Sequence, residues 1–297
     1  MAKLDLNGLD IEVESAGKES DPAVLLIMGL GMQLTAWPDA FVQNLLLQNL
    51  RVIRFDNRDC GLSSKFDAAG RPNLMMMSLR HFLHLPLSTA YGLEDMAQDA
   101  VGILDALHIE RAHVVGVSMG GMIAQLIAAD HSDRVLTLTS IMSTSGAAEL
   151  PAARAEVMRA LLARPRNSED LESVVDHFMN LLELIGSPGF PTPKELARER
   201  LMRSLQRNYC PSGTARQMVA IAASGDRSAK LARIRVPTLV IHGTDDALVP
   251  VEAGRDTARK ITGSKLFLIP GMGHDLAPGL VPIITDALRD HLTPSSR

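Results

Sequence analysis

One stretch constrains the fold of this chain more than any other, the pentapeptide Gly116-Val-Ser-Met-Gly120 between two apolar runs. The run before it is short and β-branched, as in a buried strand, and the run after it continues as an apolar helix. In this strand–turn–helix context, Gly-x-Ser-x-Gly is typical of a tight turn that exposes the serine hydroxyl. Small residues are needed at both glycine positions, because side chains there would collide with the helix. The pattern predicts Ser118 as a candidate nucleophile, with a glycine- and serine-rich turn without chemistry as the alternative.

Strand-like and helix-like runs alternate along most of the chain. The first two strand-like runs alternate apolar and polar residues around Asn7-Gly8, which predicts a hairpin. Later apolar runs suit strands that are buried on both faces, and they lie at 23–28, 51–55, 112–117, 134–141, 236–242 and 265–269. Helical spacing follows most of these runs. We therefore predict an α/β fold with a mostly parallel, doubly wound sheet and helices on both faces.

The rhythm of strands and helices changes in the middle of the chain. From residue 143 to residue 235 there is no strand-like run, and four helical stretches lie at 152–163, 168–185, 193–208 and 214–223. Thr192-Pro-Lys-Glu195 has the pattern of a capping box and predicts a helix whose first residue is Pro193. The sequence thus predicts three parts, which are a first core part at 1–142, a helical cap or lid insertion at 143–235, and a second core part at 236–297.

Composition excludes several classes of protein. The chain has 297 residues, of which 46% are hydrophobic, enough for a large core, and its formal net charge is only −4. This mild charge does not point to nucleic acid or to a membrane surface as a partner. No apolar run reaches the roughly 18 residues that a membrane span needs, and the first residues lack the apolar region of a signal peptide. We expect a cytoplasmic protein that acts on a small molecule, as a monomer or a homodimer.

The sequence also gives no sign of a cofactor or a metal. Its two cysteines, Cys60 and Cys210, are expected to be free thiols, and there is no Cys/His cluster of the kind that binds zinc. Gly29-Leu-Gly31 follows a strand-like run, but the rest of the dinucleotide-binding fingerprint is absent. We therefore predict neither a cofactor nor a bound metal.

Five segments share the sequence pattern of one known superfamily, and they are Val24–Gly29, Val52–Asp59, Ala112–Met119, Val236–Ile241 and Ile269–His274. Together they resemble the α/β-hydrolase fold, and within it the serine esterase branch that includes aclacinomycin methylesterase. The resemblance covers nearly the whole chain outside the helical insertion. It implies a serine nucleophile, a histidine base and an acid that orients the histidine, in the chain order serine, acid, histidine.

That order is met by Ser118, by an aspartate after the next-to-last predicted strand, and by His274 after the last one. All three lie just past the carboxyl ends of predicted parallel strands, where open α/β sheets place their sites. Two neighbouring residues compete for the role of the acid. The family pattern Gly-x-x-Asp, counted from Gly243, favours Asp246 over Asp245. An ordinary surface-loop histidine is the alternative for His274.

The resemblance also implies an oxyanion hole made of two backbone N–H groups. One belongs to Met119, at the start of a helix whose dipole favours negative charge. The other belongs to Leu30, in the loop after the third predicted strand. Many relatives have His-Gly where this chain has Met28-Gly29, a difference that affects how the loop is braced rather than the backbone donor itself. Asp56-Asn-Arg58 resembles a turn that is common in these folds, and we interpret it as structural.

The main hypothesis is a serine carboxylic ester hydrolase that forms an acyl-enzyme on a small to medium, largely apolar ester. The helical insertion, with Met75–Met77 from a long excursion at 64–91, is expected to form an apolar lid. A histidine base must be neutral, so activity should fall on acidification through the reference histidine pKa of about 6.5. A lactone, enol-lactone or C–C bond hydrolase, or a perhydrolase, would use the same three residues. A non-catalytic small-molecule binding protein on the same scaffold is the alternative from another class.

Overall fold

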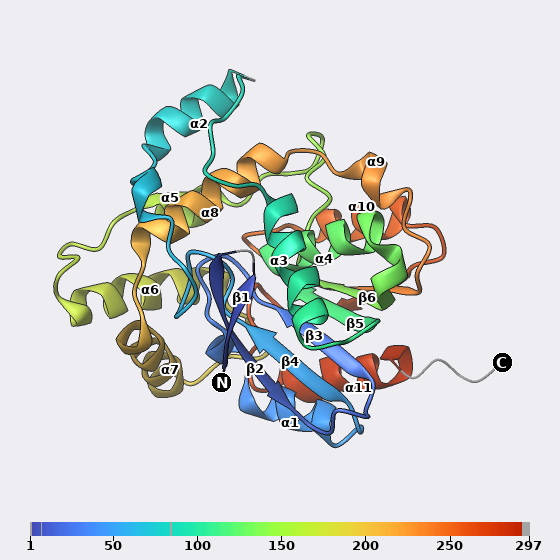
Figure 1. Ribbon diagram of the computed structural model, residues 1–297. Helices are drawn as coiled ribbons and strands as arrows, with labels where there is room; N and C mark the ends of the chain where they lie inside the picture. Colours follow the sequence, from blue (N-terminus) through green and yellow to red (C-terminus); the bar gives the residue numbers. More distant parts are fainter. Residues whose placement is uncertain (1, 7, 84, 293–297) are drawn as a thin grey trace.

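The computed structural model describes residues 2–6, 8–83 and 85–292 (Figure 1). Within them, eight strands form one sheet in the order β1-β2-β4-β3-β5-β6-β7-β8. The pairs β1–β2 and β2–β4 are antiparallel, and the other neighbouring pairs are parallel. The predicted mostly parallel α/β fold is therefore confirmed. The strands are β1 (Ala2–Leu6), β2 (Leu9–Ala16), β3 (Ala23–Ile27), β4 (Arg51–Phe55), β5 (Ala112–Val117), β6 (Val135–Ile141), β7 (Thr238–Gly243) and β8 (Lys265–Ile269).

The first two strands form the predicted hairpin. Their register pairs Leu6 with Leu9. Gly8 has φ +84°, in the left-handed region that glycine adopts without a steric penalty. Asn7, the other residue of the predicted turn, lies outside the described residues.

Helices cover both faces of the sheet, as predicted (Figure 1). Strand β3 alternates between two core clusters, because successive side chains of a strand point to opposite faces. Val24 and Leu26 pack with α1 and α11, whereas Leu25 and Ile27 pack with α3 and α4. The helices are α1 (Asp39–Leu46), α2 (Leu74–Phe82), α3 (Leu93–Ala106), α4 (Met119–Asp130), α5 (Ala155–Leu162), α6 (Leu171–Ile185), α7 (Lys194–Arg207), α8 (Pro211–Ser224), α9 (Ser228–Leu231), α10 (Val251–Lys260) and α11 (Leu280–Leu292), with 3₁₀ turns η1 (Leu34–Ala36), η2 (Asp67–Ala69) and η3 (Ser132–Arg134).

Helices α5 to α9 lie between β6 and β7, in the part of the chain predicted as an insertion. The first four correspond to the four predicted helical stretches, whereas α9 is a single turn, too short to show a period in the sequence. The predicted start of α7 is wrong by one residue, because Pro193 is the N-cap and the helix begins at Lys194. Val157 and Ile185, from α5 and α6, form a buried cluster with Ala247 of the loop after β7. The insertion thus packs directly on a loop at the carboxyl end of the sheet.

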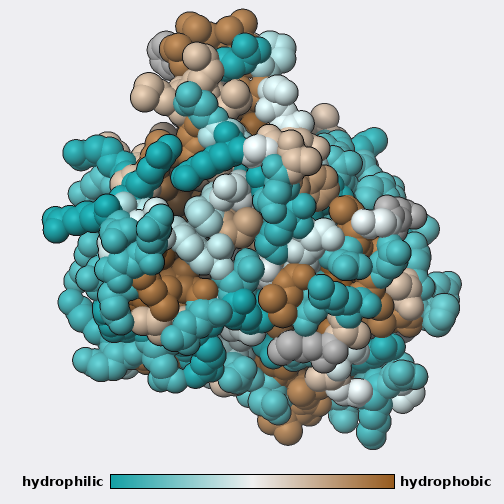
Figure 2. Space-filling view, turned by 60° about the vertical axis from the view of Figure 1, so that its left-hand side comes forward, coloured by the Kyte–Doolittle hydropathy of each residue, from teal (hydrophilic) through white to brown (hydrophobic). Residues whose placement is uncertain are grey.

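The excursion before α3 contains a helix that projects from the body of the molecule. Helix α2 lies beside α8, above the rest of the chain (Figure 1). Met75, Met76 and Leu79 have exposed fractions of 82%, 50% and 52%, and Met77 is half-buried. Figure 2 shows apolar side chains gathered on this projecting part. Met75 and Met76, which the sequence suggests as part of an apolar lid, therefore face solvent.

A buried ion pair joins α8, in the predicted insertion, to the loop after β4. Arg216 on α8 donates from Nε and Nη2 to the two carboxylate oxygens of Asp59, in the loop after β4, at 2.7 Å each. The exposed fractions of these residues are 2% and 1%. The hydroxyl of Tyr91 and the backbone N–H of Phe66 donate to the same carboxylate. Burial raises the pKa of Asp59, but the hydrogen bonds lower it by more, and the bond from Arg216 has the largest lowering effect. The pKa of Asp59 therefore lies below its ordinary value.

Replacing Arg216 with methionine is expected to lower the free energy of unfolding by about 3–5 kcal/mol at neutral pH, because a buried carboxylate loses its partner. A depressed carboxyl pKa stabilises the fold above the unfolded-state pKa of about 3.9, and this contribution is lost as the pH falls through the folded-state pKa. The difference in the free energy of unfolding between the wild type and Arg216→Met should therefore become smaller below about pH 4. Urea unfolding at neutral and acidic pH measures both effects.

The matched control for that substitution is Arg203→Met. Arg203 pairs with Glu199 in solvent, where an ion pair contributes little to stability. An Arg216→Met protein that is as stable as this control at neutral pH would contradict the prediction.

Candidate active site

Ser118 occupies a strained turn between β5 and α4. Its backbone has φ 54° and ψ −121°, a conformation that L-residues rarely adopt. A Cβ added at Gly116 would lie 2.1 Å from the carbonyl oxygen of Gly120 in α4, which confirms the predicted collision with the helix. A Cβ at Gly120 would instead lie 2.1 Å from the carbonyl oxygen of Ile27 in β3. The two glycines therefore let β3, β5 and α4 approach closely enough to turn the serine out of the sheet.

The structure brings the three predicted side chains together in one hydrogen-bonded chain. Nε2 of His274 lies 3.0 Å from Oγ of Ser118, and Nδ1 of the same ring lies 2.7 Å from Oδ2 of Asp246. Asp246 and His274 are buried, with exposed fractions of 6% and 9%. When Nδ1 carries a proton, Nε2 is an acceptor toward the serine hydroxyl. This arrangement suits a neutral imidazole that withdraws a proton from Ser118.

The two adjacent aspartates after β7 have different surroundings. Oδ1 of Asp246 accepts the backbone N–H groups of Leu248 and Val249 at 2.9 and 2.8 Å, which leaves Oδ2 for His274. Asp245 is exposed, and its Oδ2 accepts from the Thr244 hydroxyl and from the N–H of Gly271. These two hydrogen bonds lower the pKa of Asp245. Asp245 thus braces the loop that carries His274, whereas Asp246 contacts the imidazole itself.

A second histidine lies beside Asp246, and the sequence patterns do not single it out. His242, the next-to-last residue of β7, donates from Nε2 to the carbonyl oxygen of Val249 at 2.8 Å. The same Nε2 lies 3.6 Å from Oδ2 of Asp246. Burial lowers the pKa of His242 below its ordinary value, so the ring is neutral at physiological pH. It therefore packs against the acid loop without neutralising the charge of Asp246.

The two predicted oxyanion donors lie beside the serine. A Cβ added at Gly29 would lie 3.2 Å from Cβ and 3.8 Å from Oγ of Ser118, so the loop of Leu30 passes directly over Ser118. Met119 begins α4, and the first N–H groups of a helix have no acceptor within it. Among the hydrogen bonds of the described residues, none uses the N–H of Leu30 or Met119. Both groups are thus available to an incoming negative charge.

Residues of the predicted insertion contact the loops of both Asp246 and His274. The N–H of His274 donates to the carbonyl oxygen of Ile185, at the end of α6, at 2.6 Å. Gly189 donates to the carbonyl oxygen of Gly271 at 2.9 Å. A further backbone bond, from Arg154, reaches Ala247 beside the acid at 3.1 Å. The loops of Asp246 and His274 are therefore held by backbone hydrogen bonds with residues that are distant in the sequence.

The Asp-x-Arg turn after β4, which the sequence analysis interprets as structural, connects several elements. Asp56 is buried and accepts the N–H groups of Leu34 and Leu62 at 2.7 and 2.8 Å. It also accepts from Nη1 of Arg207 in α7 at 2.7 Å. Arg58 forms a bidentate salt bridge with Asp99 of α3, in which Nε and Nη2 donate to the two carboxylate oxygens at 2.6 and 2.7 Å. The turn thus ties α3, the loop after β3 and the insertion together.

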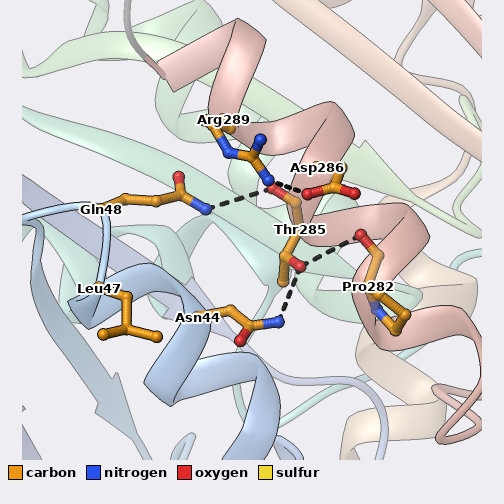
Figure 3. A pocket seen from close by; sticks show the side chains of 7 residues that line it. All are labelled: Asn44, Leu47, Gln48, Pro282, Thr285, Asp286 and Arg289. Carbon is orange, nitrogen blue, oxygen red and sulfur yellow. Dashed lines mark hydrogen bonds and ion pairs between the residues drawn. The ribbon is translucent and has the colours of Figure 1, made fainter.

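A surface pocket lies elsewhere, between α1 and α11 (Figure 3). Its polar groups bond one another, because the amide of Asn44 donates to the hydroxyl of Thr285 at 3.1 Å and that of Gln48 donates to the carbonyl oxygen of Thr285 at 3.4 Å. None of its lining residues belongs to the loops of the three predicted side chains. The chemistry described above is therefore not located in this pocket.

The part of the chain that the structure describes has neither a metal-binding cluster nor a membrane-spanning helix. No group of three or more His, Cys, Asp or Glu side chains there could hold a metal ion. No helix there is both long and apolar enough to span a bilayer. Cys60 is buried, Cys210 is half-buried, and both are free thiols.

Comparison of the sequence with known proteins finds one family and several relatives. The model of the alpha/beta hydrolase fold family matches residues 22–277. Rhodomycin D methylesterase DauP of Streptomyces sp. is 31% identical over 284 residues, which are 89% of this chain and 88% of that protein. The 2-hydroxymuconate semialdehyde hydrolase of Pseudomonas sp. is 28% identical over 84% of this chain and 80% of that protein. A methylesterase and a semialdehyde hydrolase are thus both among the relatives.

Comparison of the fold with solved structures agrees with this family match. The enol-lactonase from Burkholderia xenovorans LB400 matches with a TM-score of 0.72 and 24% identity, over 98% of this chain and 99% of that one. The meta-cleavage product hydrolase CumD from Pseudomonas fluorescens matches with a TM-score of 0.75 and 20% identity, over 98% and 97%. Together with the family match over most of its length, these likenesses show that the chain belongs to the α/β-hydrolase fold family.

Proposed function

We propose that this protein is a serine carboxylic ester hydrolase with Ser118 as nucleophile, His274 as base and Asp246 as the acid that orients the base. The observation that carries the proposal is the imidazole of His274, which lies within hydrogen-bond distance of both Ser118 Oγ and Asp246 Oδ2. A serine hydroxyl is a poor nucleophile unless a neighbouring base removes its proton. The contacts of these three residues meet that need.

The reaction proceeds in two halves. Oγ of Ser118 attacks the ester carbonyl while Nε2 of His274 takes the hydroxyl proton, and the charge on the carbonyl oxygen is held by the N–H groups of Leu30 and Met119. The tetrahedral intermediate collapses, the C–O bond to the alcohol breaks, and His274 gives the alcohol its proton. Water then attacks the acyl-enzyme by the same route and releases the acid. Asp246 keeps the ring in the required tautomer throughout.

We propose a small to medium, largely apolar ester as substrate, and a methyl ester as the first case to test. Two rhodomycin D methylesterases, 31% and 29% identical, support methyl esters. Residues 143–235 would act as the cap over the site, since backbone bonds from this part reach the loops of His274 and Asp246.

A second candidate uses the same residues on another bond. Relatives that are 26–28% identical include hydrolases of 2-hydroxy-6-oxononadienedioate, 2-hydroxymuconate semialdehyde and 2-hydroxy-6-oxo-2,4-heptadienoate, as their names state. In that reaction the acid, base and oxyanion donors would be unchanged, but the bond broken would be a C–C bond. The second candidate function therefore differs from the first in its substrate, and turnover measurements are needed to distinguish the two.

A substrate panel distinguishes the candidates. It contains p-nitrophenyl esters from acetate to long chains, methyl esters of bulky aromatic acids, and a 2-hydroxy-6-oxo-dienoate. We expect ester turnover with an optimum in acyl length, and none in Ser118→Ala. Turnover of the dienoate alone would replace the esterase proposal with the C–C hydrolase. A folded protein that turns over no member would favour the non-catalytic binding protein.

A further inference from the structure

Gln217 is a buried polar side chain in the insertion that links two loops of the core. It lies on α8, and its exposed fraction is 0%. Its Oε1 accepts the N–H of Gly31 at 2.8 Å, and its Nε2 donates to the carbonyl oxygen of Arg58 at 2.8 Å. One partner is a donor and the other an acceptor, so the orientation of the amide is determined. Gln217 therefore joins the loop after β3 to the loop after β4.

The loop after β3 carries the free N–H of Leu30, and its neighbouring peptide groups are all held. The carbonyl oxygen of Met28 accepts from Nδ2 of Asn57 at 3.1 Å. The carbonyl oxygen of Gly29 accepts from the N–H of Met32 at 3.2 Å. The next N–H along the chain is that of Gly31, which Gln217 holds. The donor of Leu30 thus lies in a turn whose direction depends on these three hydrogen bonds.

Helix α8 also contacts this turn sterically. Gly31 has φ +66°, and a Cβ there would lie 2.9 Å from Oγ1 of Thr214. Thr214 and Gln217 are three residues apart, on one face of the helix. The same helix is anchored to the core through Arg216 and Asp59. The insertion is therefore positioned to set the conformation of the turn.

We propose that Gln217 is a positioning residue of the oxyanion hole, so that the docked helix α8 of the insertion aims the Leu30 N–H at the developing charge. This inference rests on the proposed function. Donors stabilise a transition state only when they are already oriented toward the place where charge develops. Gln217 takes the bracing role that the sequence leaves open at Met28-Gly29. Its loss should affect kcat more than KM, because the oxyanion forms only during reaction.

The test compares Gln217→Met and Gln217→Glu with the wild type on the best ester of the panel. Methionine removes both hydrogen bonds with little change in volume. We expect kcat to fall about 10²-fold, as for the loss of one oxyanion donor, and KM to change by less than about threefold. Glutamate keeps the shape and can still accept from Gly31, but it cannot donate to Arg58 and adds a negative charge. We expect a larger fall in kcat for glutamate.

The pH dependence separates positioning from a loss of packing. The ratio of variant to wild-type kcat removes the titration that both proteins share. For Gln217→Glu this ratio should rise as the pH is lowered, because a protonated carboxyl is neutral and again donates to the Arg58 carbonyl. For Gln217→Met the ratio should stay constant. A loss of packing that does not depend on the charge at position 217 would give two constant ratios.

A transition-state mimic gives a second readout. An alkyl trifluoromethyl ketone forms a bond to Ser118 Oγ, and the resulting oxyanion would occupy the proposed hole. Its inhibition constant should rise in both variants by the factor by which kcat/KM falls. The matched controls are Gln206→Met and Gln206→Glu, at an exposed position of α7 in the same insertion, which should leave kcat and the inhibition constant unchanged.

The outcomes are distinct. Unchanged kcat in both Gln217 variants, or a rise in KM alone, overturns the positioning role while the esterase remains. A wild-type protein with no Ser118-dependent turnover and no ketone adduct overturns the proposed function itself. Thermal unfolding is measured for each variant, and if Gln217→Met does not fold, the isosteric Gln217→Glu and its pH-dependent ratio decide the question.

Discussion

Replacing Ser118 with alanine is expected to lower kcat by about 10⁴- to 10⁶-fold while the fold stays intact. Only the Oγ atom, 3.0 Å from Nε2 of His274, is removed. Alanine keeps the Cβ that lies against Gly29 and adds no bulk to the turn. The small residual rate would come from substrate binding and the oxyanion donors. The measurement is kcat on the best ester, with circular dichroism and thermal unfolding to establish that the variant is folded.

Covalent labelling makes this prediction independent of the substrate. An alkyl fluorophosphonate should form one P–O bond to Ser118 Oγ with release of fluoride, and mass spectrometry should locate the label on the peptide that contains Ser118. The alanine variant should take up no label. Ser168→Ala, at an exposed position of the insertion, should behave as the wild type does. Retained turnover or labelling of another serine would contradict the assignment of the nucleophile.

The sheet and the place of Ser118 could be predicted because the evidence for them is local. Strand β3 is a continuous apolar run, β5 is interrupted only by His113, and both are buried along their whole length. The glycines around Ser118 are required by contacts with neighbouring backbone, so a five-residue pattern already indicates the turn. His274 was predictable for a related reason, since parallel strands place their carboxyl ends at one edge of the sheet.

The bracing of the site could not be predicted, because it depends on partners that are far apart in sequence. Gln217 and Gly31 are separated by 186 residues, and Arg207 and Asp56 by 151. In an isolated sequence a glutamine or arginine in a helix is normally interpreted as solvated. One signal was present, because Arg216 and Gln217 share a helical stripe with Gly213 and Ala220, and all are buried. Polar residues within such a stripe of small and apolar residues indicate a buried contact.

The second large effect on kcat is expected from a substitution that distinguishes Asp246 from Asp245. Both follow β7, and only the direction of each side chain separates them. Oδ1 of Asp246 accepts two backbone N–H groups, so an asparagine there should place its amide oxygen at that position and its NH₂ toward His274. The amide then donates to Nδ1, and the imidazole proton moves to Nε2, where it faces Ser118. A ring in that tautomer cannot take the serine proton, and we expect Asp246→Asn to lower kcat by about 10⁴-fold.

Asp245→Asn is the matched control, because it makes the same change of charge one residue away. Asparagine at 245 can still accept from Thr244 and Gly271 through its amide oxygen, so the histidine loop should keep its place and kcat should change by less than about tenfold. Measuring both variants on one ester, with thermal unfolding of each, separates three cases. A large loss at 246 alone supports Asp246 as the acid, and a large loss at 245 alone would transfer the role to Asp245. Equal losses would contradict a specific acid, because displacement of the loops would then explain both.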